Sequence, residues 1–298
     1  MTLTEEILRL KKEKNAVILA HNYQPEEIQR LADYTGDSLE LAIRAKDAKE
    51  DIIVFCGVLF MAETAKILNP GKKVILPVKE AGCPLADYLT PEMVIDARKK
   101  YPGAQVVLYV NSSAESKAEA DITCTSANAV SVVASLESDT ILFGPDSNLA
   151  SWVQEQIPDK KIIPLPKGGH CPVHQAFTEE MAEKFRGEGY MTVCHPECPK
   201  AVRDRCDLVA STGGMVKNAF KSDKWIVLTE KDMVYRLKTE FPLKEFKGFE
   251  TAVCEDMKLI TPKILKKALL DEKPEITLPE DIMKRAGKAI EKMIALSR

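Results

Sequence analysis

The chain has 298 residues, of which 45% are hydrophobic and 29% charged, and its formal net charge is −3 with a sequence pI of about 6.0. This composition is typical of a folded globular protein and argues against a disordered one. The acidic balance offers no basic stripe, so we expect neither nucleic acid nor a membrane surface as a partner.

The chain lacks the roughly 18 consecutive apolar residues that a membrane helix needs, and its first residues do not resemble a signal peptide. We therefore expect a cytoplasmic protein, and stable disulfides are rare in that compartment. The eight cysteines need another explanation. Packing accounts for some of them because a free Cys behaves as a small hydrophobe, and others are candidate metal ligands.

The predicted elements repeat three times along the chain. Each copy opens with a short apolar strand, expected at residues 16–20, 106–108 and 191–194. A helix, a segment rich in Ser, Thr and small residues, and a second helix follow. They lead to a second strand, expected at residues 51–55, 140–143 and 225–228. A further helix then precedes a third strand, which the first two copies mark with a Lys-Lys pair at residues 72–77 and 160–166.

Three kinds of landmark residue advance along the chain almost in step. They are a strand-end residue (His21, Tyr109, His195), a hydroxyl residue (Ser38, Ser126, Thr212) and a cysteine (Cys83, Cys171, Cys254). The first two sets step by 88 and then 86 residues, and the cysteines step by 88 and then 83. This agreement predicts a true internal repeat. The third copy diverges most, because it lacks the Lys-Lys and the Cys-Pro.

The alternation of strands and helices predicts an α/β fold of three homologous three-layer αβα modules around a pseudo-threefold axis. We place the modules at residues 16–88, 89–174 and 175–254, and expect bracing helices in residues 1–15 and 255–298. Ligands of parallel sheets bind beyond the carboxyl ends of the strands. We therefore expect the three sets of landmark residues to meet at one central active site.

One cysteine from each module at a common centre suggests a metal site. The alternative is three buried thiols at equivalent packing positions. A structural zinc site would need a fourth protein ligand, whereas three thiolates suit a [4Fe–4S] cluster with one open iron. The C-x3-C-x2-C pattern of radical enzymes fails, since Ala201 stands where a third cysteine would follow Cys194 and Cys198. That pair remains a weak candidate for a zinc or disulfide pair, and we interpret the others as packing residues: Cys56, Cys124 and Cys206.

Each first strand is followed by two polar residues that are two positions apart. The pairs are His21 and Tyr23, Tyr109 and Asn111, and His195 and Glu197. In an extended chain such residues point the same way, so each module would aim two polar groups at the centre. His, Tyr and Glu are common proton donors and acceptors, although each could also have an ordinary structural role.

Ser38, Ser126 and Thr212 each precede an expected helix. Plain N-capping would explain a Ser or Thr at such a position. The functional alternative is an anion site, because helix N-termini attract carboxylates and phosphates. Three such termini at one centre would bind a polyanionic small molecule.

A set of short motifs, in this order, resembles the quinolinate synthase family, and the resemblance covers essentially the whole chain. The motifs are His21-Asn22-Tyr23-Gln24, Gly36-Asp37-Ser38, Gly82-Cys83-Pro84, Tyr109-Val110-Asn111-Ser112, Thr125-Ser126-Ala127-Asn128-Ala129, Gly169-His170-Cys171, His195-Pro196-Glu197-Cys198 and Met257-Lys258-Leu259-Ile260-Thr261. The ordered set is specific to that family, whereas any one motif alone would not be.

The resemblance implies a transferase of NAD biosynthesis that condenses iminoaspartate with dihydroxyacetone phosphate to quinolinate, with loss of phosphate and water. It implies a [4Fe–4S] cluster on Cys83, Cys171 and Cys254, with the open iron as Lewis acid. Proton transfer is expected from Tyr23 and Glu197, with further catalytic roles for His21, Tyr109 and His195. The implied substrate contacts are His21, Ser38, Tyr109, Asn111, Ser126, His195, Glu197 and Thr212. A transient contact with the enzyme that supplies iminoaspartate is a further expectation.

Two other functions stay open from the residues. Another [4Fe–4S] hydro-lyase could use the same open iron to dehydrate a single small hydroxy acid. A non-enzymatic iron–sulfur sensor or carrier would have exposed cysteines near a loop or a chain end. Cysteines at module junctions beside six convergent polar residues argue against the sensor.

Overall fold

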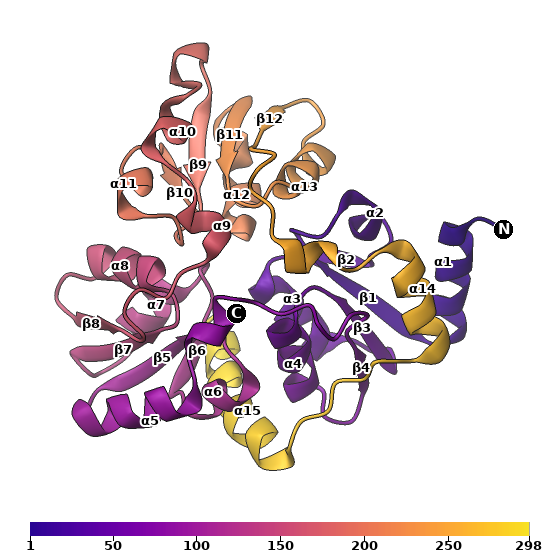
Figure 1. Cartoon of the computed structure of the whole chain (residues 1–298), viewed down its shortest axis with the longest axis horizontal. Coiled ribbons are helices and arrows are strands. Elements are labelled where there is room, and N and C mark those ends of the chain that lie inside the picture. Colours follow the sequence, from indigo (N-terminus) through magenta and orange to yellow (C-terminus); the bar gives the residue numbers. More distant parts are fainter. Residues whose placement is uncertain (298) are drawn as a thin grey trace.

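Three separate parallel sheets organise the chain. In the computed structural model, which describes residues 1–297, each sheet has four strands, and the three sheets form distinct groups in Figure 1. The strand orders are β2-β1-β3-β4, β6-β5-β7-β8 and β10-β9-β11-β12, so the topology is the same in all three. The predicted α/β class is confirmed, and the arrangement is consistent with three αβα modules.

The two central strands of the first sheet, β1 and β3, are strongly apolar, and every residue of both is buried. The strands are β1 (Ala16–His21), β2 (Tyr34–Gly36), β3 (Ile52–Cys56) and β4 (Lys73–Ile75). The helices are α2 (Glu26–Gln29), α3 (Ser38–Asp47), α4 (Leu59–Leu68) and the 3-10 helix η1 (Ala86–Tyr88). Burial on both faces explains why these strands read as continuous Val and Ile runs.

The second and third sheets repeat this pattern. The second has strands β5 (Gln105–Tyr109), β6 (Ile122–Cys124), β7 (Thr140–Gly144) and β8 (Lys161–Pro164). Its helices are α5 (Pro91–Lys100), α6 (Ala114–Ala118), α7 (Ala129–Ala134), α8 (Ser147–Gln156) and α9 (Pro172–Gln175). The third has strands β9 (Met191–Cys194), β10 (Leu208–Val209), β11 (Lys224–Leu228) and β12 (Glu245–Lys247). Its helices are α10 (Glu179–Glu183), η2 (Arg186–Glu188), α11 (Lys200–Arg203), α12 (Thr212–Asn218), η3 (Ala219–Lys221) and α13 (Met233–Glu240).

The prediction of three strands per module was wrong, because each sheet has a fourth short strand. β2, β6 and β10 have only two or three residues each and lack the apolar run that marks a strand in sequence. The third strand expected in the third copy is β12, whose bounds could not be predicted because that copy lacks the Lys-Lys pair found at β4 and β8.

The pairing register of the two central strands is equivalent in the three sheets, so the landmark residues occupy equivalent positions. The last pairs between the two central strands are Ala20 with Cys56, Leu108 with Gly144, and Cys194 with Leu228. The residue that follows the first member of each pair is His21, Tyr109 or His195. The landmark residues therefore mark equivalent carboxyl ends of the three sheets.

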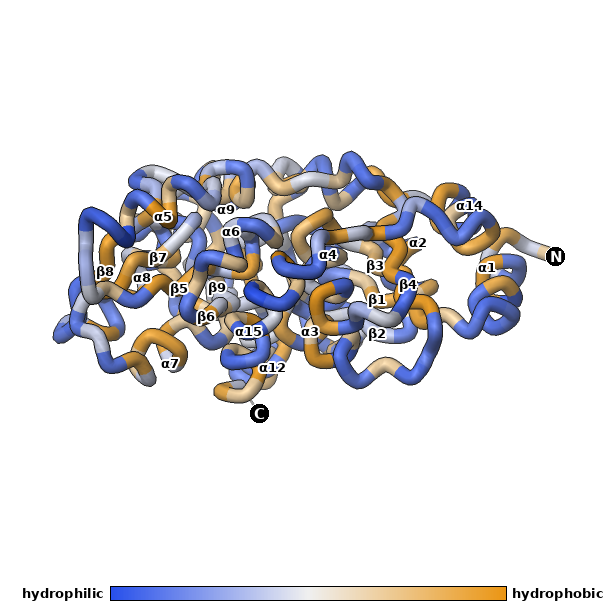
Figure 2. The backbone as a smooth tube through the Cα atoms, turned by 90° about the horizontal axis from the view of Figure 1, so that it is seen from below, coloured by the Kyte–Doolittle hydropathy of each residue, from blue (hydrophilic) through white to orange (hydrophobic). Residues whose placement is uncertain are grey.

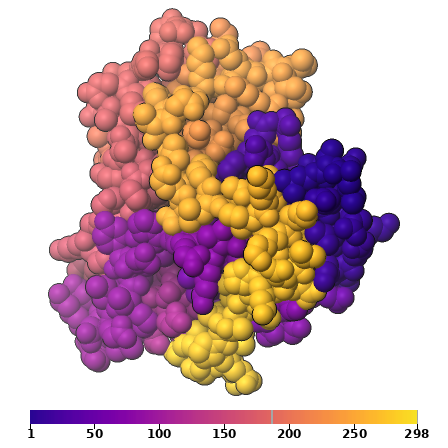
Figure 3. Space-filling model, turned by 45° about the vertical axis from the view of Figure 1, so that its right-hand side comes forward, coloured from indigo at the N-terminus to yellow at the C-terminus, as the bar shows by residue number. Residues whose placement is uncertain are grey.

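Helices from both ends of the chain lie against the modules. They are α1 (Leu3–Glu13), the 3-10 helix η4 (Glu255–Lys258), α14 (Pro262–Asp271) and α15 (Glu280–Leu296). α1 packs on α14, and α15 contacts both α4 and α6. In Figure 3 the yellow C-terminal segment lies between the indigo first module and the magenta second module. The module boundaries after residues 88 and 174 stay a prediction.

The apolar side chains divide between a shared core and smaller clusters in the second and third modules. The largest cluster joins the first two sheets with α1, α14 and α15, while the third sheet has its own clusters on its two faces. Figure 2 shows strands that are mostly hydrophobic and connecting segments that are mostly hydrophilic. None of the helices in residues 1–297 combines the length and the apolar character that would let it cross a bilayer.

We predict that Gly144→Ala destabilises the second module. A Cβ at Gly144 would lie 2.0 Å from the backbone carbonyl oxygen of Leu165, so the chain would have to move. Overpacking of this kind costs about 1–3 kcal/mol. The midpoint of thermal unfolding should fall in this variant and stay unchanged in the control Gly71→Ala, whose Cβ would meet nothing within 4 Å. Equal midpoints would contradict the prediction.

Candidate functional site

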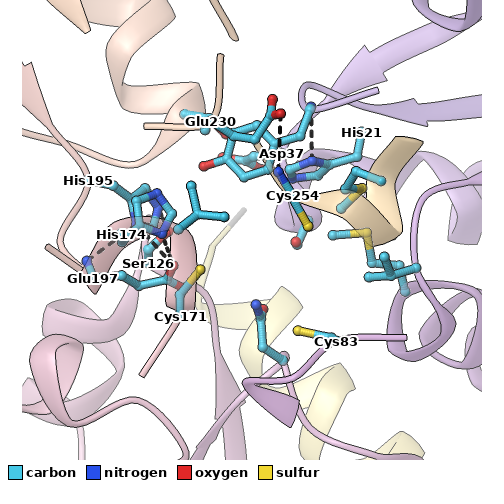
Figure 4. Close-up of a pocket in the computed structure, with 18 of the residues that line it drawn as sticks. His21, Asp37, Cys83, Ser126, Cys171, His174, His195, Glu197, Glu230 and Cys254 are labelled. Atoms are coloured by element: carbon cyan, nitrogen blue, oxygen red, sulfur yellow. Dashed lines mark hydrogen bonds and ion pairs between the residues drawn. The ribbon is translucent and has the colours of Figure 1, made fainter. Parts of the chain in front are cut away.

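The carboxyl ends of the three sheets line one central cavity, shown in Figure 4. Every residue that the sequence predicted for the site lines it: His21, Tyr23, Ser38, Cys83, Tyr109, Asn111, Ser126, Cys171, His195, Glu197, Thr212 and Cys254. The cavity also has lining residues that sequence reasoning missed, among them Asp37, His174 and Glu230.

The polar pairs do not lie on extended strands, which corrects the geometry expected from the sequence. β1 ends at His21, and the chain turns so that the Gln24 amide donates to the His21 carbonyl at 2.9 Å. The Tyr23 amide donates to His21 Nδ1 at 3.2 Å, and the Glu197 amide donates to His195 Nδ1 at 3.3 Å. In these two pairs the imidazole accepts the backbone amide in place of a carbonyl of a neighbouring strand. Both members of each pair still line the cavity.

These contacts also decide which nitrogen of each ring carries hydrogen. Because Nδ1 of His21 and of His195 accepts a backbone N–H, the neutral tautomer has its hydrogen on Nε2. Burial lowers the pKa of each imidazole to about 3, so both rings are neutral near pH 7. His195 Nε2 lies 3.0 Å from Ser126 Oγ and donates to it.

A chain of short contacts joins Tyr23 to Glu197. Tyr23 Oη lies 2.6 Å from Thr229 Oγ1, and Thr229 Oγ1 lies 2.8 Å from His174 Nε2. His174 Nδ1 in turn lies 2.6 Å from Glu197 Oε2, and its ring stacks on His195 with 4.5 Å between the centroids. The two residues expected to transfer protons are therefore connected through two that the sequence analysis overlooked.

The burial of Glu197 sets the electrostatics of this chain, since only 3% of the residue is exposed. Burial alone would raise the pKa of the carboxyl, but the neighbouring His195 and His174, with a hydrogen bond from Tyr109, hold it below its usual range. Burial and the charge of Glu197 raise the pKa of Tyr23 and of Tyr109. Both phenols therefore keep their protons and act as donors.

The capping explanation for the hydroxyl residues is wrong. The N-cap of α3 is Asp37 and the N-cap of α12 is Ser211, so Ser38 and Thr212 are the first helical residues. Ser126 lies three positions before the start of α7. Asp37 and Ser211 already accept the free helix amides, so capping does not require the hydroxyls of Ser38 and Thr212.

The three cysteines face the same space from three sides, as Figure 4 shows. Burial raises the pKa of Cys83 to about 12 and of Cys254 to about 11, and it also raises that of Cys171. In each case the backbone amide three residues further on, of Ala86, His174 or Met257, opposes this effect by donating to the sulfur. Three convergent sulfurs with amide donors fit the ligand set of an iron–sulfur cluster.

The site also contains a mixed group of donors around one cysteine. The sulfur of Cys171, a ring nitrogen of His174 and a carboxylate oxygen of Glu197 all lie within 4.8 Å of one another. His174 lies outside the short motifs that mark the repeat in the sequence. A histidine three residues after a proposed ligand, in a chain with only four histidines, was the available signal.

The other five cysteines lie outside this cavity. Cys56 and Cys124 are fully buried in the shared apolar core, as expected for packing residues. Cys194 contacts the thiols of both Cys198 and Cys206 in the third module, so Cys206 has a polar partner as well as a packing role. Within residues 1–297 all eight cysteines are free thiols.

Comparison with known proteins gives a consistent result over the full chain. A family model described as quinolinate synthetase A protein matches residues 5–295. The chain is 53% identical to the quinolinate synthase of Pyrococcus horikoshii, and the alignment covers 100% of both chains. It is 53% identical to that of Methanothermobacter thermautotrophicus, with 99% of this chain and 98% of the relative covered. It is 48% identical to that of Thermotoga maritima, with 99% of both covered.

We predict that Thr229→Val lowers the free energy of unfolding by about 1–3 kcal/mol, because it leaves buried groups of Tyr23 and His174 without their partner. Thr64→Val is the matched control, since the buried Thr64 hydroxyl donates only to the Phe60 carbonyl of its own helix. Denaturant unfolding of both variants measures the difference. Equal losses would show that the Thr229 contacts are not formed.

Proposed function

The chain belongs to the quinolinate synthetase A family of enzymes, and from this membership we propose that it condenses iminoaspartate with dihydroxyacetone phosphate in the cytoplasm. The products are quinolinate, phosphate and water, and the reaction is a step of NAD biosynthesis. The observation that carries the proposal is the convergence of three free cysteines and the polar strand-end residues on one cavity. A pseudo-threefold relation of the three modules is part of the proposal.

We assign Cys83, Cys171 and Cys254 as the ligands of a [4Fe–4S] cluster. The support is the chemistry of the donor set: three sulfurs in one cavity, each with a backbone amide directed at it. With three protein ligands, such a cluster supplies one open iron, a Lewis acid that polarises a hydroxyl leaving group. Amide donors to the sulfurs are among the contacts that tune clusters of this type.

The proton-transfer roles go to Tyr23 and Glu197. Tyr23 keeps its proton because burial raises the pKa of its phenol, so it can act as a general acid. Glu197 is held as a carboxylate and can act as a base. Thr229 and His174 connect the two, so a proton lost at one end of the chain can be replaced from the other.

The substrate carboxylates need donors, and the cavity supplies neutral ones. His21 presents an Nε2–H, because its Nδ1 is occupied by a backbone amide. Ser126 accepts from His195 and its hydroxyl also bonds to Tyr109, so Ser126 lies oriented between these two residues. Thr212 Oγ1 accepts from Asn22 Nδ2 at 3.0 Å and is oriented in the same way. Among the described residues, the buried Asn111 Oδ1 has no hydrogen-bond partner, as expected of a group that contacts a ligand.

The direct test uses anaerobically reconstituted protein and both substrates. Quinolinate should form only when iminoaspartate and dihydroxyacetone phosphate are present together. A hydro-lyase for one hydroxy acid would instead turn over with a single substrate. Iron and sulfide analysis of the same preparation should give about four of each per chain if the cluster is of the proposed type.

We predict that Cys83→Ser, Cys171→Ser and Cys254→Ser each abolish cluster assembly, because each removes one of three thiolate ligands. Cys56→Ala serves as the control, since Cys56 is buried in the apolar core away from the cavity. Iron content and visible absorption measure the outcome. A chromophore that survives the loss of Cys171 would refute the proposed ligand set.

We predict that Tyr23→Phe keeps the cluster and lowers kcat by about 10²–10⁴-fold, the range typical of a general acid. The change removes only a hydroxyl, so the ring contact with His21, 4.6 Å between centroids, should remain. Steady-state kinetics with both substrates, together with iron content, separate catalysis from assembly. Near-normal turnover would transfer the proton-donor role to another group.

A further inference from the structure

Two buried carboxylates occupy the same place in the second and third modules. Asp146 Oδ2 accepts from the backbone amide of Cys171 at 3.2 Å, and Glu230 Oε1 accepts from that of Cys254 at 3.4 Å. The partners are separated by 25 residues in one module and by 24 in the other. Each carboxylate lies two positions beyond the end of its central strand, β7 or β11. The two contacts are therefore equivalent features of the repeat.

In the first module the carboxylate that binds the cysteine loop comes from a different part of the chain. Two positions beyond the end of β3 stands Val58, which has no side-chain acceptor. Here the backbone amide of Gly82, which directly precedes Cys83, donates to Asp256 Oδ1 at 3.0 Å. Asp256 belongs to η4 and comes from a segment 174 residues further along the chain. All three cysteine loops thus have a carboxylate bound to their backbone.

Helix capping does not account for this pattern. Asp146 does cap α8, but through its other oxygen, Oδ1, which accepts from the Leu149 amide at 2.7 Å. Glu230 caps no helix, since the N-cap of α13 is Asp232. Asp146 is 0% exposed and Glu230 is 1% exposed. A carboxylate at such depth needs partners for its oxygens, and besides the Cys254 amide Glu230 binds Lys258 Nζ at 2.7 Å and the Asp232 amide at 2.9 Å.

We propose that Asp146, Glu230 and Asp256 are positioning residues that hold the backbone of the three cysteine loops, so that the sulfurs converge before iron binds. This inference rests on the proposed cluster. The carboxylates do not touch iron in this scheme; they fix the peptide from which each ligand projects. Partners that orient metal ligands in this way typically change metal affinity by about 10–100-fold when removed.

Asp256 offers the cleanest test because, within residues 1–297, its side chain makes no hydrogen bond other than the one from the Gly82 amide. Asp256→Ala removes the acceptor for the Gly82 amide, whereas Asp256→Asn keeps an oxygen at Oδ1. We expect the alanine variant to release iron to a chelator about 10–100-fold faster than wild type. The asparagine variant should retain iron like wild type. In cluster-free protein, hydrogen exchange at the Gly82 amide should rise in the alanine variant alone.

Asp146→Ser provides the second arm. The serine hydroxyl can still cap α8 but is too short to reach the Cys171 amide, so folding and positioning are separated. Iron release should accelerate while the midpoint of thermal unfolding stays near that of wild type. Thr90→Ala is the matched control for a lost cap in the same module, because Thr90 caps α5 and touches no cysteine loop.

The outcomes distinguish the positioning role from the proposed function. Wild-type protein that binds no iron would overturn the cluster and, with it, the role assigned to the carboxylates. Wild-type protein with a full cluster, and with alanine and serine variants that release iron at the wild-type rate, would overturn the positioning role alone. Equally fast release from Asp256→Ala and Asp256→Asn would also overturn it, since the retained acceptor would then have no effect.

Discussion

The buried carboxylate of Glu197 is the group on which the centre of the molecule depends. A charge at this depth would destabilise the fold strongly unless several donors met it. His174 Nδ1 lies 2.6 Å from it and Tyr109 donates to it, and both residues belong to the second module, whereas Glu197 belongs to the third. The contacts that make the carboxylate tolerable therefore also bring two modules together. The same contacts link the residues to which we assign proton transfer.

The repeat was readable in the sequence because its landmarks are side chains at fixed points of the sheets. A parallel strand places its last residues at one edge, so equal spacing along the chain becomes proximity in space. His21, Tyr109 and His195 follow directly from this rule. The positions of Thr229 and His174 could not be predicted in this way. Thr229 contacts Tyr23, 206 residues away in sequence, and His174, 55 residues away, and no local sequence pattern indicates contacts over such separations.

The local backbone geometry at the strand ends and helix starts was harder to predict than the convergence of the site residues on one cavity. An i, i+2 rule assumes that the strand continues, but the His21 ring accepts the amide of Tyr23 and turns the chain instead. In the same way, Ser38 looks like a helix cap until Asp37, one position earlier, takes the helix amides. In both cases a side chain two or three residues away accepts the backbone amide, and this local contact sets the geometry.

The segment after Cys254 shows how an imperfect repeat can still build one site. Met257 O accepts from Gln24 Nε2 at 2.9 Å, and Lys258 binds both the Tyr23 carbonyl and the Asp232 carboxylate. One short 3-10 turn thereby ties the first module's strand-end loop to the third module. The first module has Val58 at the repeat position where the other two have a carboxylate, and the same turn supplies Asp256 instead. The segment that follows the third module lies at the centre of the molecule. It can therefore supply the carboxylate that the first module does not have at its own repeat position.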